Sequence, residues 1–550
     1  MIRISELKLP LDHAEEALPA LVAHTLGLEP TQIAHFTVFK HSFDARKAAL
    51  VQVYIVDVAL VDAAQEAELL QQHPDNPHLR ASPDMAYTPV GHAPADLAIR
   101  PVVVGFGPCG IFAALVLAQM GFKPIVLERG TSVRQRTQDT WGLWRKNVLK
   151  PESNVQFGEG GAGTFSDGKL YSQIKDPRFL GRKVMQEFVK AGAPEEILVA
   201  AHPHIGTFKL VKVVEHLREQ IIALGGEVRF EQRVTDVEIV DGHIRGLTVL
   251  NQATGETEEL RADHVVLALG HSSRDTFAIL HARGVYVEAK PFSIGFRIEH
   301  PQSLIDRARW GRHAGHPLLG AADYKLVHHA NNGRAVYSFC MCPGGTVVAA
   351  TSEPGRVVTN GMSQYSRNER NANAGIVVGI TPEDFPGGPL AGIDLQRQLE
   401  SHAYVLGGSS YEAPGQLVGD FIAGRASSQL GSVEPSYKPG VKLGDLHSAL
   451  PGYAIEAIRE ALPVFGRKIK GFDLHDAVLT GVETRTSSPI KMTRGDDFQS
   501  LTVRGLYPAG EGASYAGGIL SAGVDGIKVA EAVARSLLTA ASFYSYPIAA

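Results

Sequence analysis

Residues 100–130, RPVVVGFGPCGIFAALVLAQMGFKPIVLERG, are the stretch that decides the fold. The β-branched run VVV is typical of a short buried strand, and it leads directly into the G-x-G-x-x-G of residues 105–110. The apolar pattern that follows has the length of a helix and is closed by Gly121. A second strand pattern, PIVL, then ends in Glu128. The stretch therefore predicts a β-α-β unit with a glycine-rich loop at the start of its helix.

Each part of this unit has a task in binding a dinucleotide. Gly105 allows the tight turn, Gly107 lets the backbone approach a pyrophosphate, and Gly110 lets the helix lie close to the strand. The first amides of the helix, after Pro108, point at the phosphates. Glu128 stands where a carboxylate accepts from ribose hydroxyls, and this disfavours a ribose phosphate. The stretch predicts a site for FAD or NAD, and by itself it does not choose between them.

The composition is that of a soluble globular protein with more than one domain. The chain has 550 residues, 44% of them hydrophobic and 20% charged, with a formal net charge of −5. This charge balance lacks the excess of basic residues that is typical of proteins that bind nucleic acid or an anionic membrane. Three cysteines and an N-terminus without an apolar signal core suggest a reducing, cytoplasmic location. No apolar run reaches the length that a bilayer span needs, so we expect no membrane segment.

Residues 1–95 have the patterns of a separate module. Strand and helix patterns follow in the order β-α-β-β-α, and a last strand is expected at residues 85–90, within a proline-rich linker over residues 73–94. The order predicts a ferredoxin-like α+β sandwich of the split β-α-β type. Six basic against twelve acidic side chains argue against RNA binding. We expect a docking or dimerisation module, through which the chain could meet a protein partner or a second copy of itself.

The remaining chain divides into three parts by its patterns. Residues 96–290 read as the first part of a Rossmann-type α/β domain, including a β-meander that starts at residues 227–230. Residues 291–478 read as an inserted mixed α+β substrate domain. Residues 479–550 return to the nucleotide fold through the strand and acidic turn GLYPAGEG and a final helix. The two ends of this Rossmann domain are therefore expected to meet around one cofactor.

The substrate domain is expected to be mostly sheet. Separate strands are predicted at residues 335–339 and 346–350, on either side of CMCPGG, and one helix near residues 395–406. No second G-x-G-x-x-G occurs in this domain.

A second glycine-rich segment, NVQFGEGGAGTFSDGKL, occupies residues 154–170. A flexible surface loop is one interpretation. Against it, Phe157, Phe165 and Leu170 are interleaved with the glycines and would anchor the segment to a core. We expect a cofactor-contacting loop, with its contacts made by Gly160, Gly161, Gly163 and Thr164.

Together, VVVGFGPCGIFAA…VLERG, VVLALG and LYPAGEGASYAGGI resemble the two-dinucleotide-binding-domain flavoproteins related to glutathione reductase. More narrowly, GEGGAGTFSDGKL, KPFSIGFRIEH, FCMCPGGTVVAA, NGMS and ETRTSSP resemble bacterial FAD-dependent (NAD/FAD-utilising) dehydrogenases of unassigned substrate. The resemblance covers nearly the whole chain and implies noncovalent FAD. It implies that Val234 meets the adenine, that Gly270 passes beneath the nucleotide, and that Gly510 and Glu511 lie near the ribityl chain and phosphates. Glu511 departs from the family, many of whose members have Asp there. The implied flavin contacts are Gly517, Gly518 and Ile519, and Pro108 and Arg129 are also expected to contact the cofactor.

The candidates for catalysis are weaker. Cys340 and Cys342 could be a redox pair beside flavin, but their spacing is not the usual one, and buried free cysteines often act as small hydrophobic residues. His271 directly follows Gly270 and is placed to face the cofactor. Arg485 could clamp a carboxylate, with Ser487 supplying a hydroxyl, or it could pair with Glu483 in a structural turn. Lys169 could reach the flavin from the glycine-rich loop.

The sequence thus predicts an FAD-dependent oxidoreductase that acts on a small, anionic substrate, with NADH or NADPH as a possible transient electron donor. One alternative is a flavin-loaded redox sensor or assembly module without turnover. Another is a flavin-dependent RNA-modifying enzyme, which the acidic N-terminal module disfavours. No metal site is expected, because two thiols supply only half of a zinc site.

Overall fold

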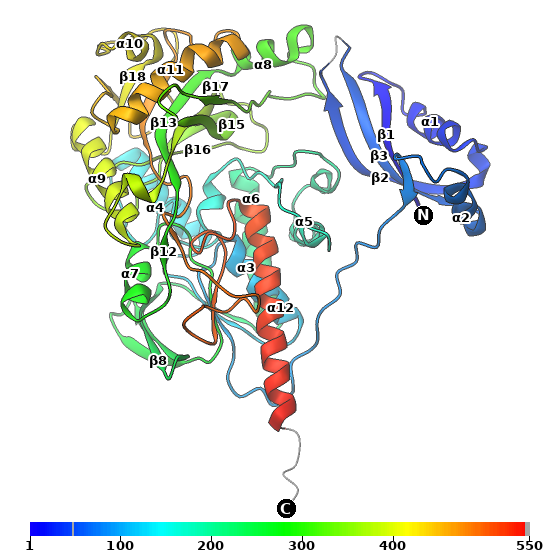
Figure 1. The fold of residues 1–550 in the computed structure, drawn as a ribbon, viewed down its shortest axis with the longest axis horizontal. Coiled ribbons are helices and arrows are strands. Elements are labelled where there is room, and N and C mark those ends of the chain that lie inside the picture. Colours follow the sequence, from blue (N-terminus) through cyan, green and yellow to red (C-terminus); the bar gives the residue numbers. More distant parts are fainter. Residues whose placement is uncertain (47–48, 545–550) are drawn as a thin grey trace, which may run out of the picture. The chain divides into compact units, whose positions relative to one another are not determined.

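The computed structural model describes residues 1–46 and 49–544, and these form two compact units (Figure 1). The N-terminal unit comprises Met1–Tyr87 together with Lys175–His204. The main unit comprises Thr88–Ile174 and the chain from Ile205 onward. None of the described helices combines the length and the hydropathy that crossing a bilayer requires.

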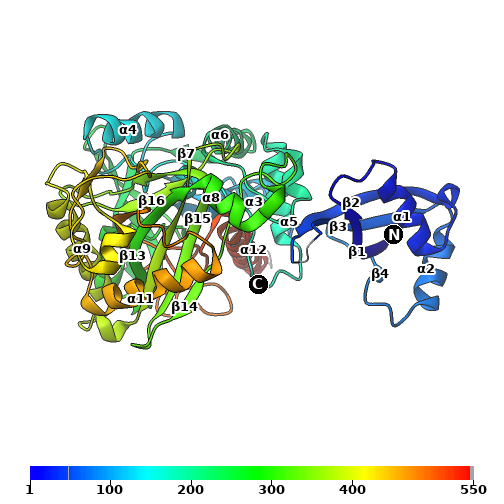
Figure 2. The same ribbon diagram turned by 90° about the horizontal axis from the view of Figure 1, so that it is seen from above.

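The N-terminal unit is a four-stranded antiparallel sheet with helices packed on it (Figure 2). Its sheet order is β2-β3-β1-β4, the strand order and pairing of a split β-α-β sandwich. Buried side chains of β1, β3 and α1, among them Ile4, Val22 and Val56, form its core. The elements are β1 (Ile2–Pro10), α1 (Ala17–Leu26), β2 (Ile33–Asp44), β3 (Val51–Leu60), α2 (Ala63–Gln72) and β4 (Leu79–Ala81).

Two details of this unit differ from expectation. The last strand lies at residues 79–81, where Leu79 packs on the core, and residues 85–90 form no strand. Residues 175–204, expected in the Rossmann domain, belong to the N-terminal unit. They carry helix α5 (Leu180–Lys190), and the N–H of His41 in β2 donates to Val199 O at 2.7 Å. Backbone pairing of this kind is invisible to a local sequence pattern.

In the main unit, a five-stranded parallel sheet has the order β22-β11-β5-β6-β7. Helix α3 (Pro108–Gln119) is buried along almost its whole length, because α12 (Ile519–Tyr544) packs on it, as Figure 1 shows. A Cβ at Gly526 of α12 would lie 2.3 Å from Cys109 O, so the two helix backbones nearly touch. The strands are β5 (Val102–Val104), β6 (Ile125–Leu127), β7 (Glu227–Arg229), β11 (Val265–Leu267) and β22 (Leu506–Pro508); the other helices near the sheet are α4 (Val133–Lys146), α6 (Thr207–Ala223) and α7 (Arg274–Ala282).

The β-meander is present but begins one strand later than predicted. Residues 227–229 form β7 and join the edge of the parallel sheet, because they pair with β6. The antiparallel meander consists of β8 (Gln232–Val240), β9 (His243–Asn251) and β10 (Thr257–Arg261).

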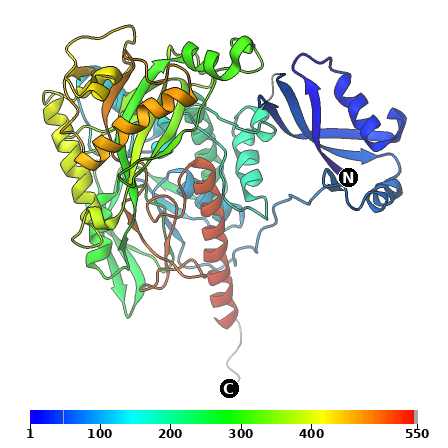
Figure 3. The same cartoon turned by 45° about the horizontal axis from the view of Figure 1, so that its top comes forward.

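The insertion is built on an eight-stranded mixed sheet, with α11 lying across it in orange in Figure 3. Apolar side chains of α11, such as Ile458 and Phe465, belong to the same buried core as Ile294 and Ile376 of the sheet. The prediction of a single helix here was wrong, since four form. The strands are β13 (Phe292–Pro301), β14 (Val327–His329), β15 (Ala335–Ala349), β16 (Thr359–Met362), β17 (Asn371–Ile380), β18 (Ala413–Leu417), β19 (Val441–Leu443) and β20 (Val478–Glu483); the helices are α8 (Gln302–Trp310), α9 (Ala391–Leu406), α10 (Val418–Ala423) and α11 (Gly452–Lys468). A short ribbon of β12 (Glu288–Ala289) and β21 (Ile490–Lys491) joins the insertion to the nucleotide fold.

Strand β15 replaces the two separate strands predicted around CMCPGG. It is continuous, but its register with β17 shifts between Phe339 and Cys342 and again between Cys342 and Gly345. Cys340 has a positive φ of 44° at the first shift. Such a bulge re-aims side chains relative to a regular strand.

Candidate functional site

The main unit encloses a cavity of about 390 Å³, within the range of small-molecule and cofactor sites, roughly 300–1,000 Å³. One wall comes from the segments that follow the carboxyl ends of β5, β6, β11 and β22. This is where open α/β sheets bind their ligands. The opposite wall comes from the insertion, through Phe339 and Cys340 of β15 and Asn360 of β16.

Two glycine-rich loops meet in the first wall. Gly105 has a φ of 99°, and a Cβ there would lie 2.3 Å from Ala268 O. A Cβ on Gly110 would lie 1.9 Å from Gly105 O, so only glycine fits at these positions in the turn and at the start of the helix. The second loop lies against the first, since a Cβ on Gly161 would be 2.8 Å from Gly107 Cα. The glycine-rich segment 154–170 is therefore packed into the wall of the cavity, not a free surface loop.

Glu128 lies at the end of β6 and is held by the backbone on both sides. Its Oε2 accepts from Phe106 N–H at 2.9 Å and its Oε1 from Gly130 N–H at 2.8 Å. These bonds fix the carboxylate on the cavity wall, and each oxygen keeps a lone pair for a hydroxyl donor.

Most of the residues predicted to bind a cofactor line this one cavity. Four of them lie behind its surface: Gly110 packs on the backbone of Gly105, Gly160 packs on the side chain of Thr164, Thr164 itself is buried, and Gly510 packs on Cys109. Those that line it are Gly105, Gly107, Pro108, Glu128, Arg129, Gly161, Gly163, Val234, Gly270, Glu511, Gly517, Gly518 and Ile519.

Arg129 is a built part of the wall. Its guanidinium lies over the Phe157 ring at 4.1 Å and donates four hydrogen bonds to Glu152 and Asp275, at 2.8–3.0 Å. Because its donors are engaged, the guanidinium of Arg129 would contact a ligand mainly by stacking its flat face on it.

The residues present fit a bound FAD. Gly270, Gly517 and Gly518 line the cavity, and a Cβ on any of them would meet no atom within 4 Å, so their backbones are accessible to a flat ligand. The N-terminus of α3 faces the cavity at Gly107 and Pro108, where helix amides favour phosphate. The amides of Gly517 and Gly518 point at Ser521 Oγ, at 3.2 and 3.1 Å, which orders the start of α12.

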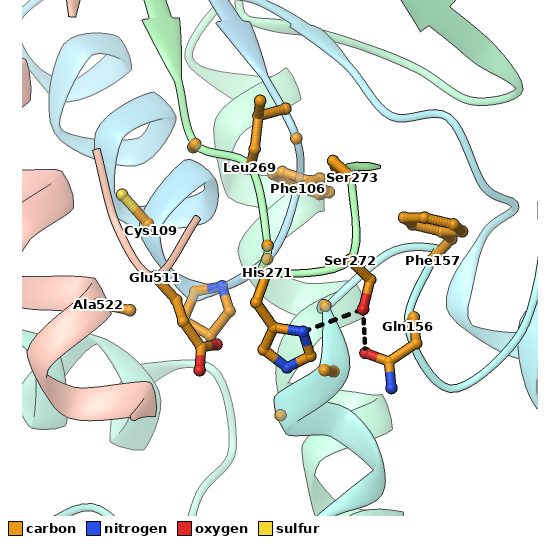
Figure 4. A pocket seen from close by; sticks show the side chains of 18 of the residues that line it. Phe106, Cys109, Gln156, Phe157, Leu269, His271, Ser272, Ser273, Glu511 and Ala522 are labelled. Atoms are coloured by element: carbon orange, nitrogen blue, oxygen red, sulfur yellow. Dashed lines mark hydrogen bonds between the residues drawn. The ribbon is translucent and has the colours of Figure 1, made fainter. Parts of the chain in front are cut away.

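His271 stands at the head of a hydrogen-bond chain (Figure 4). Its Nδ1 lies 3.0 Å from Ser272 Oγ, which donates to Gln156 Oε1 at 3.0 Å. The amide orientation is set because Gln156 Nε2 donates to Ala350 O at 2.9 Å. Ser272 has only one proton, and Gln156 takes it, so Nδ1 of His271 carries a proton and its Nε2 is an acceptor. Burial lowers the pKa of His271 to about 3, with Arg485 and Arg274 adding to the effect, and the ring is neutral.

Arg485 lines the cavity, but its donors are engaged elsewhere. It donates to Glu400 Oε1 at 2.8 Å and Oε2 at 3.3 Å, and to Ser272 and Ser352 at 3.0 and 2.8 Å. The alternative in which Arg485 pairs with Glu483 was wrong, because Glu483 lies 3.4 Å from Arg297. Glu400 also binds Arg274 at 2.9 Å. Burial raises the pKa of Glu400, but these two guanidinium groups hold it well below its usual range.

The insertion wall contributes a thiol and a cation. Cys340 lines the cavity and Cys342 is fully buried behind it. Lys169, from the second glycine-rich loop, also lines the cavity and donates to Met341 O. Burial lowers the pKa of Lys169, but the two sulfur atoms and Asp167 raise it overall, so it stays a cation.

Ser487 does not line this cavity. It accepts a hydrogen bond from Lys290 Nζ at 3.3 Å and faces a separate surface hollow. Glu511 does line the cavity, and burial raises its pKa to about 7, although Lys290 opposes this.

Several functional side chains escaped the sequence analysis. Gln156 and Ser272 adjoin the glycine segments, and their position next to Gly158 and Gly270 was the available signal. Glu400 and Arg297 come from the middle of α9 and β13, and no local pattern marks them. In the described part of the chain, no group of three or more His, Cys, Asp or Glu side chains is arranged to hold a metal ion.

A parallel sheet whose glycine-rich loop, acidic strand end and second helix N-terminus converge on one cavity defines an α/β dinucleotide-binding protein. Two family descriptions cover much of the chain: "FAD dependent oxidoreductase" matches residues 169–331, and "FAD-dependent protein, C-terminal domain-like" matches residues 291–486. Residues 1–59 match a domain of unknown function. An uncharacterized protein of Clostridium beijerinckii is 46% identical over 96% of this chain and 98% of its own length. The chain belongs to the same family as that protein, and it is a member of the FAD-dependent oxidoreductases.

The solved structures that the chain matches are far more distant. An FAD complex of glycerol-3-phosphate dehydrogenase from Bacillus halodurans is 11% identical over 82% of this chain and 66% of that chain, with a TM-score of 0.36. The Escherichia coli quinol fumarate reductase subunit FrdA is 13% identical over 82% and 71%, with a TM-score of 0.35. Likenesses this weak carry no argument about substrate.

Proposed function

We propose that this chain binds FAD without a covalent link and oxidises or reduces a small, anionic substrate held against the flavin by the insertion. The observation that carries the proposal is the single cavity, whose one wall is a glycine-lined nucleotide cradle and whose other wall is the insertion. Pockets at such junctions bury a small ligand between two domains. The resemblance to bacterial FAD-dependent dehydrogenases supports the same assignment.

In this proposal, each part of the cavity has a task. Gly105, Gly107 and the start of α3 hold the pyrophosphate, and Glu128 accepts from the adenosine ribose. Val234 lies at the adenine end, and Gly517–Ile519 lie at the flavin end. FAD supplies two-electron chemistry when it is bound.

The residues of the chain would prepare the substrate beside it. Lys169 attracts an anion, and the closed insertion wall excludes water. Nε2 of His271 accepts a hydrogen bond, because its neutral tautomer is fixed by Ser272. Arg485 acts on His271 through its hydrogen bond to Ser272. It is therefore a positioning residue, since Glu400 and two serines hold its guanidinium. NADH or NADPH is a candidate electron donor, and the N-terminal unit a candidate docking or self-association module.

The test starts with the purified yellow protein. Denaturation should release FAD into the supernatant. Anaerobic mixing with NADH, NADPH and a panel of small hydroxycarboxylates, phosphates and thiols should bleach the flavin with one class, and small oxidants such as disulfides are then tested for reoxidation of the bleached flavin. Lys169→Met should raise the KM for that substrate by about tenfold or more, the loss of one charge-assisted hydrogen bond. Lys146→Met, an exposed lysine at the end of α4, is the matched control. A protein without FAD, or equal KM values for the two variants, would contradict the proposal.

A further inference from the structure

Cys340 and Cys342 lie together at one point of the cavity wall. Cys340, which stands at the register shift of β15 and has a positive φ, lines the cavity, while Cys342, two residues further on, is fully buried and does not line it. Both are free thiols. A buried pair used only for packing would not need one member exposed to a cofactor cavity through a strained backbone.

Charged groups surround this pair on several sides. Arg297 of β13 is fully buried, and its Nη2 donates to Cys340 O at 2.5 Å and to Cys342 Sγ at 3.5 Å. Lys169 reaches the carbonyl of Met341, the residue between the two cysteines. Two cations thus face the thiols from different elements, an arrangement that stabilises a thiolate.

The acids that face the same point are largely neutralised. Asp167 is bound by Arg367 at 2.5 Å, and Glu483 is paired with Arg297 at 3.4 Å. Burial raises the pKa of Glu483 and of Glu511 to about 7, which reduces their negative charge near neutral pH.

The two sulfur atoms respond to this field in opposite ways. The neighbouring Cys342 side chain, together with Lys169 and Arg297, lowers the pKa of Cys340 to about 5 despite its burial. The Cys340 sulfur and burial raise the pKa of Cys342. At neutral pH the pair is therefore one thiolate and one thiol, and the Cys342 thiol donates to the carbonyl of Cys340 at 3.4 Å.

We propose that Cys340 and Cys342 are a redox-active dithiol of the FAD cavity, in which Cys340 is the thiolate that faces the flavin and Cys342 the thiol that closes the disulfide. This deepens the proposed function, on whose bound FAD it rests. When the S–S bond forms, the Cys340 thiolate and the Cys342 thiol give up two electrons and one proton. FAD takes up both electrons and the proton as its anionic reduced form, so the step balances without another reactant. Run in reverse, it regenerates the dithiol for a small disulfide substrate, which Cys340 attacks to form a mixed disulfide that Cys342 resolves.

The first measurement counts thiols in the FAD-loaded protein. After anaerobic reduction with dithiothreitol and its removal, alkylation in denaturant should label all three cysteines. After the flavin is reoxidised and cycled, only Cys109 should be labelled, and the Cys340–Cys342 peptide should be two hydrogens lighter. Free Cys340 and Cys342 after flavin cycling would overturn the proposal.

The second measurement is the pH dependence of alkylation in the native protein. Cys340 should react at a rate that is flat above about pH 6, and at pH 7 about tenfold or more faster than Cys109, whose pKa burial raises. Lys169→Met should move the onset to higher pH, and Lys169→Arg should move it less. A Cys340 rate that climbs steadily to pH 8.5, as for an ordinary thiol, would contradict the thiolate. If bound FAD shields Cys340, the ultraviolet thiolate absorbance of wild type minus Cys340→Ser gives the same titration.

The third measurement separates this inference from the proposed function. Anaerobic dithiothreitol should bleach the flavin of wild type and of Met341→Leu, which changes only the residue between the cysteines. Bleaching of Cys340→Ser and Cys342→Ser should be slower by about tenfold or more, whereas dithionite should bleach all four. Equal rates in all four, with FAD content and melting unchanged, would overturn the dithiol and leave the proposed function standing. Absence of FAD from every variant would instead contradict the proposed function.

Discussion

The two walls of the cavity are built on different principles. The nucleotide wall is local: Gly105, Gly107 and Gly110 lie within six residues, and a Cβ on Gly105 or Gly110 would clash with neighbouring backbone. The insertion wall is assembled from distant segments, and buried charges hold it: Glu400 of α9 binds Arg274 of α7 and Arg485 after β20. A wall built from neighbouring residues can be recognised in the sequence as a motif. A wall held by ion pairs between distant residues cannot be recognised in this way, although its residues are just as firmly fixed.

If this contrast is right, the largest single effect on stability comes from the charge at the centre of the second wall. Glu400→Gln should lower the free energy of unfolding by about 3–5 kcal/mol, because it leaves two buried guanidinium groups short of a counter-charge. Urea unfolding of the FAD-loaded protein measures this.

Glu353→Gln is the matched control for that change. Glu353 binds the same Arg274, at 3.0 Å, but it is partly exposed, so its loss should cost much less. Equal effects of the two substitutions would show that Glu400 is not the centre of the wall.

The nucleotide wall should fail in a different way, by losing cofactor. Gly105→Ala would force a side chain into a backbone with a φ of 99° and a Cβ against Ala268 O at 2.3 Å. We expect FAD affinity to fall by about tenfold to a hundredfold, from roughly 1–2 kcal/mol of backbone strain and the clash. The amount of FAD per chain and its dissociation constant measure the effect.

Gly284→Ala isolates the strain from the clash. Gly284 has a φ of 86°, but a Cβ there would meet no atom within 4 Å, and it does not line the cavity. It should cost stability while FAD affinity stays unchanged. A loss of FAD from this control would mean that backbone strain anywhere in the fold expels the cofactor.

How much could be predicted follows the same division. The β-α-β unit, the strand ending at Gly270 and the turn at Gly510–Glu511 were recognisable, because each is a short pattern with one geometry. The pairing of Arg485 could not be predicted, because its partner Glu400 lies 85 residues away on a helix whose buried face looks like any other. The bulge at Cys340 was missed for a related reason: PGG after the cysteines reads as a strand end, but β17 continues the pairing past it.

Glu511 lies where the two walls meet, and its substitution should have a pH-dependent effect. Its pKa of about 7 in the folded chain exceeds that of an ordinary Glu, so between pH 4.5 and 7 the folded state holds a proton that the unfolded state has released. Wild-type stability therefore falls as pH rises through this window. Glu511→Gln should stabilise the protein by about 1–2 kcal/mol at pH 8 and by much less at pH 5.

The measurement is urea unfolding at saturating FAD and at both pH values. Glu434→Gln, at an exposed glutamate of the insertion, should show no such difference. A gain from Glu511→Gln that is equal at pH 5 and pH 8 would mean that Glu511 is not held as the neutral acid.

The smallest expected effect concerns Ser272, the hydroxyl that links the two walls. Ser272→Ala should lower the free energy of unfolding by about 1 kcal/mol, because Arg485 and Gln156 each lose one hydrogen-bond partner. Ser352→Ala should cost a similar amount, since Ser352 accepts from the same Arg485 Nη1 at 2.8 Å. Only Ser272 also fixes the proton on Nδ1 of His271. The ¹⁵N shifts of that imidazole should therefore move toward a mixture of tautomers in Ser272→Ala and stay as in wild type in Ser352→Ala. Unchanged shifts in both variants would show that the orientation of His271 is set within the nucleotide wall alone, and the serine would then be no link between the two.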